Sequence, residues 1–162
     1  MKKEIELNAE TAYVAVLRIL NRADKTEAEI RKKLKEKGFS YNDRTAAVER
    51  AKNNGLINDK RYAELYFEFN RERKGSRRIR LELERKGIDE ELIKNVLAEN
   101  EESDACLEVA VRFARNKTRD EKFQAKLMRH LAARGFEYGA IRKAVMKVLD
   151  GDENGYFDGA ED

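Results

Sequence analysis

The chain has 162 residues, of which 41 % are charged, with a formal net charge of +3, no proline and one cysteine. A single cysteine excludes an internal disulfide and a thiolate zinc cluster, and no apolar run approaches the roughly 20 residues that a membrane helix needs. The absence of proline, together with many good helix formers, favours long helices with solvated faces. We therefore expect an all-α protein in the cytoplasm, with no membrane contact.

Positive charge is concentrated outside the last thirteen residues. Residues 150–162 hold six acidic residues and no basic one, so residues 1–149 carry 35 basic against 26 acidic residues. A basic body with an acidic tail indicates a polyanionic partner or a partner with an acidic surface. A helical protein with evenly solvated faces would have the same composition, so charge alone leaves both interpretations open.

A period of 48 to 49 residues organises the chain. The peptide KEKGF at 35–39 returns as ERKGI at 84–88 and as AARGF at 132–136. One copy of about 48 residues is near the lower size limit for a stable lone domain, so neighbouring copies should share interfaces. The period predicts three tandem three-helix repeats that form an elongated, curved array.

The repeats are expected between a short extension and the acidic tail. The predicted segments are an N-terminal extension at 1–7, repeats at 8–57, 58–102 and 103–149, and a C-terminal tail at 150–162. Nine helices are expected, at 8–20, 26–37, 43–55, 58–75, 76–87, 89–100, from 103, from 118 and at 138–149. Capping boxes are predicted at Thr26 with Glu29 and at Thr118 with Glu121. A four-residue insertion is predicted near 116–120.

The central repeat has the clearest helical pattern. Its first helix carries apolar residues at spacings of three and four, which predicts that they share one face: Tyr62, Leu65, Tyr66 and Phe69. The apolar residues of its second helix are Ile79, Leu81 and Leu83. Gly75 is expected to separate the two helices, and Gly87 to end the second in a left-handed conformation.

Two stretches are strongly basic. Residues 71–86 hold eight basic against three acidic residues, and residues 112–134 hold eight against two. Arginine binds phosphate or carboxylate through two parallel hydrogen bonds, which favours a binding surface; pairing within helices, as of Arg78 with Glu82, is the alternative. The predicted helix at 89–100 is acidic, so base reading by a helix-turn-helix arrangement is not expected. Weak, non-specific contact with the DNA backbone fits better.

The acidic tail matches the spacing of an EF-hand calcium loop. The matching residues are Asp150, Asp152, Asn154, Gly155, Asp158 and Glu161. We expect neither an exit helix after Glu161 nor a second EF-hand to pair with this loop. We therefore favour a tail that solubilises the chain or competes with a polyanion for the basic faces, and we expect no bound metal and no cofactor.

Residues for catalysis are not evident. His130 is the only histidine, and spacing suggests no serine, cysteine or acidic partner for it. Cys106 lies in an apolar helical pattern that is typical of a buried thiol. There is no glycine-rich phosphate loop of either common kind. We expect no catalytic residue and no enzymatic activity.

Residues 58–88 carry a resemblance to a known family. The matching residues are Asn58, Asp59, Arg61, Tyr62, Ala63, Tyr66, Gly75, Arg78, Ile79, Leu83, Lys86, Gly87 and Ile88. They closely resemble the hallmark of the bacterial RecX regulatory proteins, and the likeness extends over about 12–149. The resemblance implies three tandem three-helix repeats. It also implies a modulator that lodges in the groove of the RecA recombinase filament on DNA and blocks ATP hydrolysis, strand exchange and co-protease activity.

The resemblance also implies roles for individual residues. The positions expected to define the fold are Asn58, Asp59, Arg61, Tyr62, Ala63, Tyr66, Gly75, Ile79, Leu83 and Gly87. The positions expected to contact recombinase or DNA are Arg71, Arg73, Lys74, Arg77, Arg78, Arg80 and Lys86. We expect a monomer that modulates recombination, DNA repair and the SOS response. The alternative is a non-specific nucleic-acid-binding helical module.

Overall fold

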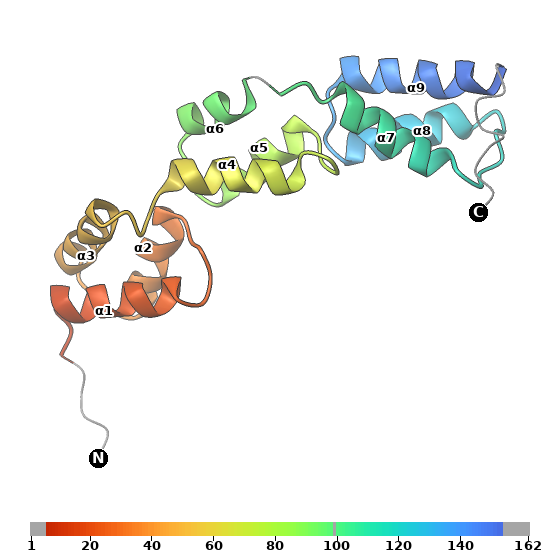
Figure 1. Cartoon of the computed structure of the whole chain (residues 1–162). Coiled ribbons are helices and arrows are strands. Elements are labelled where there is room, and N and C mark those ends of the chain that lie inside the picture. The colour runs from red at the N-terminus through yellow and green to blue at the C-terminus, as the bar shows by residue number, and fades with distance from the viewer. Residues whose placement is uncertain (1–5, 99, 154–162) are drawn as a thin grey trace. The chain divides into compact units, whose positions relative to one another are not determined.

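The computed structural model describes residues 6–98 and 100–153 of the chain, and these residues form nine α-helices and no strand (Figure 1). The helices are α1 (Ala9–Leu20), α2 (Glu27–Glu36), α3 (Tyr41–Asn53), α4 (Asp59–Asn70), α5 (Ser76–Arg85), α6 (Glu90–Leu97), α7 (Ser103–Ala114), α8 (Phe123–Ala133) and α9 (Tyr138–Glu153). The predicted all-α fold of three tandem helix triplets is confirmed. Within the described ranges, no helix is long and apolar enough to cross a membrane.

The chain divides into two compact units. The first consists of Met1–Tyr66 and Leu83–Asn95, and the second of Phe67–Glu82 and Val96–Asp162. Each unit therefore contains one complete outer triplet together with parts of the three central helices, α4, α5 and α6.

Two helix starts follow the sequence signals closely. At α1, the Asn8 side chain accepts from the Thr11 N–H at 3.0 Å, and the Thr11 hydroxyl accepts from the Asn8 N–H at 3.0 Å. At α2, Thr26 and Glu29 form the predicted capping box, with bonds of 3.2 and 3.0 Å. Both boxes satisfy N–H groups of the first turn that have no partner inside the helix.

Two other starts differ from prediction. Helix α3 begins at Tyr41 because Ser40, rather than Asp43, is its N-cap; the Ser40 hydroxyl accepts from the Asp43 N–H at 3.1 Å. The capping box predicted at Thr118 is wrong, since α8 begins only at Phe123. The carboxylate of Asp120 accepts from the Lys122 N–H at 3.0 Å and its carbonyl from the Phe123 N–H at 2.9 Å.

Three helix ends also differ. Helix α4 ends at Asn70, five residues before the predicted end at Gly75, because the chain turns there, with the N–H groups of Arg73 and Lys74 donating to the Asn70 carbonyl at 3.0 and 2.9 Å. Helix α6 ends at Leu97, three residues before the predicted end, whereas α9 continues four residues past Leu149. The segment predicted to be a tail from Asp150 therefore begins as helix.

The repeat positions predicted from the sequence form the interior. We call the second helix of each triplet its middle helix; these are α2, α5 and α8. The six equivalent residues of the three middle helices are all fully buried: Ile30, Leu34, Ile79, Leu83, Leu127 and Leu131. In the first unit, Ile30 and Leu34 belong to a core with Val16 and Val48. In the second, Leu127 and Leu131 belong to a core with Phe123, Phe136 and Val145.

The buried face of α4 is not the predicted one. Leu65 is 47 % exposed and Phe69 is 79 % exposed, while Ala63 is fully buried and Phe67 nearly so. The buried face of α4 therefore contains Ala63 and Phe67, which are four residues apart. Because alanine is small, the pattern of large apolar residues does not indicate this face. On α5, Leu81 is likewise 45 % exposed between two buried neighbours, Ile79 and Leu83.

The middle helices end at glycines that hold a left-handed conformation. The backbone φ angle is +76° at Gly87 and +84° at Gly135, which favours glycine over any side chain with a Cβ atom. Each glycine also packs closely on the start of another middle helix. A Cβ atom at Gly87 would overlap the Cβ of Ala28, and one at Gly135 would overlap the Cβ and backbone nitrogen of Arg78.

A junction in the first unit joins the end of α5 to the start of α2. The Thr26 hydroxyl, at the N-cap of α2, donates to the carbonyl of Lys86 at 2.6 Å. The Asp59 carboxylate, at the start of α4, accepts from the N–H of Glu27 at 2.9 Å. Burial is the largest effect on the Asp59 carboxyl and raises its pKa. A side chain from the next repeat therefore satisfies the first N–H of α2.

The second unit repeats this junction between the end of α8 and the start of α5. The N–H of Gly75 donates to the Arg134 carbonyl at 2.9 Å. The buried Glu102 carboxylate, just before α7, accepts from the Ser76 N–H at 2.7 Å and the Ser76 hydroxyl at 2.8 Å. Its other oxygen accepts from the Glu137 N–H, just before α9, at 2.5 Å. One carboxylate thus binds the N-terminal ends of two helices, where anionic groups are stabilised.

Three glycine-to-alanine variants separate the cost of the left-handed conformation at Gly135 from the cost of its close packing on Arg78. Gly139 lies within α9 with open space beside it, so Gly139→Ala should raise the free energy of unfolding by about 0.5–1 kcal/mol. Gly55 has a φ of +68° and nothing near its Cβ position, so Gly55→Ala should cost about 1 kcal/mol. Gly135→Ala adds overlap with Arg78 and should cost at least about 1 kcal/mol more, measured by urea unfolding. Equal costs at Gly55 and Gly135 would contradict the close packing.

The buried carboxylate at the second junction is expected to be important for stability. Glu102→Ala leaves the N–H groups of Ser76 and Glu137 without their acceptor, which should cost about 2–4 kcal/mol in urea unfolding. Glu108→Ala removes an exposed carboxylate of α7 and serves as the control, with a change within about 0.5 kcal/mol. Similar effects of the two substitutions would refute this role for Glu102.

Candidate functional site

The predicted contact residues fall in both units. The six that belong to the second unit lie at the end of α4, in the following turn and at the start of α5: Arg71, Arg73, Lys74, Arg77, Arg78 and Arg80. Lys86 belongs to the first unit, just after α5. The structure therefore groups six of the seven predicted residues.

Half of this group forms ion pairs. Glu82 accepts from Lys74 at 2.7 Å and from Arg78 at 3.1 Å, so its carboxylate is shared by two cations. Arg71 lies 3.3 Å from Glu68, and its guanidinium is 5.4 Å from the centroid of the Phe67 ring. The alternative of intrahelical pairing thus holds for Arg78 with Glu82.

Arg73, Arg77 and Arg80 form what we call the arginine triplet. Within the described part of the second unit, no carboxylate forms an ion pair with any of the three. Arg73 and Arg77 are exposed and Arg80 is half-buried. Arg77 and Arg80 are three residues apart on α5 and therefore project from neighbouring positions of one face. The triplet offers guanidinium groups to an external phosphate or carboxylate.

Arg134 joins this surface although the sequence placed it in the other basic stretch. Its guanidinium donates to the Arg73 carbonyl at 3.3 Å, and its own carbonyl accepts from the Gly75 N–H. Arg78 reaches the same region, donating to the Ala133 carbonyl at 3.4 Å. The signal that could have revealed Arg134 is its position directly before Gly135, which the repeat makes equivalent to Lys86 before Gly87.

Lys86 has a different environment in the first unit. Its ammonium lies 3.6 Å from Glu29 and 5.5 and 5.9 Å from the ring centroids of Tyr62 and Tyr66, which stack on each other. A hydrogen bond with Tyr62 is the main cause of its raised pKa. Because the ammonium is already engaged, we leave Lys86 out of the binding surface.

The remaining hallmark residues mostly occupy structural positions. The Asn58 side chain caps α4 by accepting from the Arg61 N–H at 2.9 Å. Gly75 is buried, and a Cβ atom there would overlap the backbone of Gly135 and Phe136. Arg61 is exposed and lines a cavity of about 710 Å³ in the first unit, together with Leu17 and other residues of α1.

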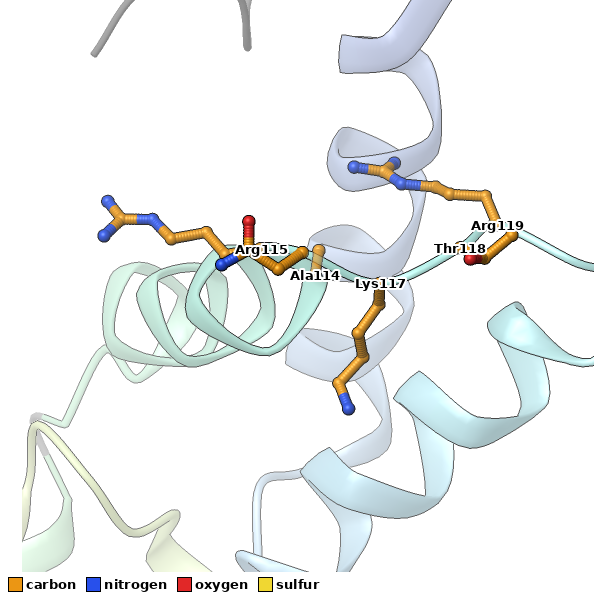
Figure 2. A pocket seen from close by; sticks show the side chains of 6 residues that line it. Ala114, Arg115, Lys117, Thr118 and Arg119 are labelled. Atoms are coloured by element: carbon orange, nitrogen blue, oxygen red, sulfur yellow. The ribbon is translucent and has the colours of Figure 1, made fainter. Parts of the chain in front are cut away.

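A second basic site lies in the loop between α7 and α8. Arg115, Lys117 and Arg119 line a pocket of about 470 Å³, and Figure 2 shows the Arg119 side chain lying across α9. Arg119 donates to the Val148 carbonyl of that helix at 2.9 Å. The Lys117 ammonium lies 4.5 Å from the centroid of the Phe113 ring.

The other titratable candidates are embedded in structure. Cys106 is fully buried, as predicted, and burial raises the pKa of its thiol to about 12. His130 is half-buried, with its ring centroid 4.5 Å from that of Phe113. Among the described residues, no three His, Cys, Asp or Glu side chains gather in a way that could hold a metal ion.

The predicted calcium loop is only partly described. Asp150 and Asp152, at loop positions 1 and 3, lie within helix α9. Asn154, Asp158 and Glu161 lie outside the described residues. The calcium interpretation therefore gains nothing from the geometry.

The fold and these surfaces define an all-α protein of three tandem three-helix domains with an arginine-rich face. Models of the first, second and third three-helix domains of RecX match residues 12–50, 58–97 and 100–145, respectively. The chain therefore belongs to the RecX family of regulatory proteins.

Individual relatives agree with this assignment. The chain is 30 % identical over 145 residues to the regulatory protein RecX of Clostridium perfringens (strain 13 / Type A), covering 85 % of this chain and 68 % of that protein. It is 35 % identical over 143 residues to the RecX of Legionella pneumophila (strain Corby), covering 85 % and 94 %. The crystal structure of RecX from Lactobacillus salivarius superposes with a TM-score of 0.76 at 26 % identity, covering 88 % and 96 %.

His130 should make stability depend on pH. Burial, followed by Arg134 and Lys117, lowers its pKa below the ordinary value of 6.5, so the folded chain binds the proton more weakly than the unfolded chain. This contribution to stability is complete above pH 6.5 and is lost as the pH falls from 6.5 through the lowered value. Between about pH 7.5 and 5.5, the wild type should lose more free energy of unfolding than His130→Gln. Parallel losses in the two proteins would contradict the assignment.

Proposed function

We propose that this chain binds the RecA recombinase filament on DNA and inhibits its ATP hydrolysis, strand exchange and co-protease activity. It thereby modulates recombination, DNA repair and the SOS response, as a cytoplasmic monomer without enzymatic activity. Membership in the RecX family supports a regulatory role, and the hallmark resemblance supports this partner. The observation that carries the proposal is the arginine triplet, whose members lack a carboxylate partner among the described residues of their unit.

The chemistry of the triplet suits such a filament. A nucleoprotein filament presents both phosphates and protein carboxylates, and a guanidinium binds either through two parallel hydrogen bonds. Such contacts read charge and geometry rather than base sequence. Weak, non-specific contact with the DNA backbone is therefore part of the proposal, with recombinase supplying the remaining affinity.

The alternative is a non-specific nucleic-acid-binding module, which the basic pocket around Arg115 and Lys117 favours. The two functions predict different affinities. The alternative requires binding to bare DNA that weakens steeply with salt, because each phosphate contact releases a counterion. The regulator should bind recombinase-coated DNA more tightly than either component alone.

The test is ATP hydrolysis by a recombinase filament on single-stranded DNA, titrated with this protein. The informative variant is Arg73→Ala, Arg77→Ala, Arg80→Ala. It leaves Lys74 and Arg78 intact, because their shared ion pair with Glu82 could affect folding. The matched control removes three exposed lysines of α2: Lys32→Ala, Lys33→Ala, Lys35→Ala.

We expect the wild type and the lysine control to inhibit hydrolysis at similar concentrations. The arginine variant should need at least about 10-fold more protein while keeping its helical circular dichroism, since a hydrogen bond to a charged group contributes about 1.5–3 kcal/mol. Absence of inhibition by the wild type would refute the proposed function and favour the alternative. Equal inhibition by the arginine variant would instead place the contact surface elsewhere.

A further inference from the structure

The loop between α7 and α8, residues 115–119, concentrates three cations that the arginine triplet does not include. Arg115 and Lys117 are exposed, and no carboxylate in the described part of the second unit forms an ion pair with either. The nearest acidic residue in sequence, Asp120, instead pairs with Lys126 of α8 at 3.1 Å. We call this segment the basic loop; its pocket is shown in Figure 2.

Arg119 fixes the basic loop against the end of α9. Its guanidinium donates to the Val148 carbonyl at 2.9 Å and lies 5.1 Å from the centroid of the Phe123 ring. Helix α9 ends at Glu153, five residues after Val148, which corresponds to about 8 Å along the helix axis. The described end of α9, from which the chain continues, therefore lies near the carbonyl that Arg119 contacts, within the same unit.

Residues 154–162, which follow Glu153, have the complementary charge. They contain Asp158, Glu161 and Asp162 and no basic residue. Nine residues can extend about 30 Å, which exceeds the separation from the loop. Tyr156 and Phe157 add aromatic rings that can pack on guanidinium or ammonium groups. Such a tether gives an effective concentration in the millimolar range, so a weak contact is sufficient for occupancy.

We propose that the acidic segment 154–162 binds in cis to the basic loop 115–119 and occupies it as a substitute for a phosphate-bearing partner. A polyanion that binds the loop must first displace this segment, so its apparent association constant equals the intrinsic constant multiplied by the fraction of chains in which the loop is free. The cis contact itself does not depend on recombinase. Only its consequence for nucleic acid rests on the proposed function.

The direct test compares ¹H–¹⁵N spectra of the full chain and of a chain that stops after Glu153. At about 20 mM salt, truncation should shift the amide signals of residues 115–119 and leave α1–α3 unchanged. The differences should disappear at about 1 M salt, where the screening length is about 3 Å. No shifts in the loop, or shifts spread over all basic segments, would overturn the proposal.

Coupling to polyanion binding gives a second readout, with a fluorescent oligothymidylate as the probe. Truncation should tighten binding at least about threefold in the wild type. The gain should vanish in Arg115→Ala, Lys117→Ala, and persist in Arg142→Ala, Lys143→Ala, which removes the same charges near the other end of α9. An equal gain in the loop variant would mean that the segment acts through general repulsion, which also overturns the proposal.

The two proposals can fail separately. Loop shifts on truncation, together with no inhibition of recombinase by the full chain, would keep the cis contact and refute the regulatory function. Inhibition without loop shifts would do the reverse.

Discussion

The structure depends on a carboxylate at the start of the first helix of one triplet, which satisfies the first N–H group of the middle helix in the triplet before it. Asp59 has this role for α2 in the first unit, and Glu102 has it for α5 in the second. A helix end packed against another helix has no water to satisfy its first amides, so an acceptor must come from the protein. Glycine at the end of the neighbouring middle helix lets the two backbones approach. The carboxylate and the glycine together explain how repeats of about 48 residues, each near the lower size limit for a lone domain, pack into stable structures.

The same junction determines which charges stay available for a partner. Glu102 is occupied by backbone N–H groups, and Glu82 by Lys74 and Arg78. No carboxylate in the described part of this unit forms an ion pair with the arginine triplet. The Arg134 side chain meets the Arg73 carbonyl beside it, so the basic stretches of the second and third repeats meet at this junction. The candidate binding surface thus lies beside the contact between two repeats.

The period could be predicted because a similar short peptide recurs every 48 to 49 residues, and the local caps because they depend on residues a few positions apart. The capping box at Thr26 and the left-handed glycines are examples. The start of α8 could not be predicted in this way, since Thr118 and Glu121 match a capping box, whereas α8 begins at Phe123 and its N-cap residue Lys122 makes no side-chain cap bond. Contacts such as Glu102 with Ser76 and Glu137, which are 26 and 35 residues away, have no local pattern. The contact of Arg134 with the Arg73 carbonyl, 61 residues away, has no local pattern either, and only its repeat position before Gly135 marks this residue.

We propose that the surface around the second junction contacts the recombinase filament. Backbone hydrogen exchange of this protein, free and bound to recombinase on single-stranded DNA, tests it most directly. Protection on binding should be greatest in residues 71–80 and around Arg134, with little change in α1–α3. Protection concentrated in α1–α3, with residues 71–80 exchanging as in the free protein, would contradict it.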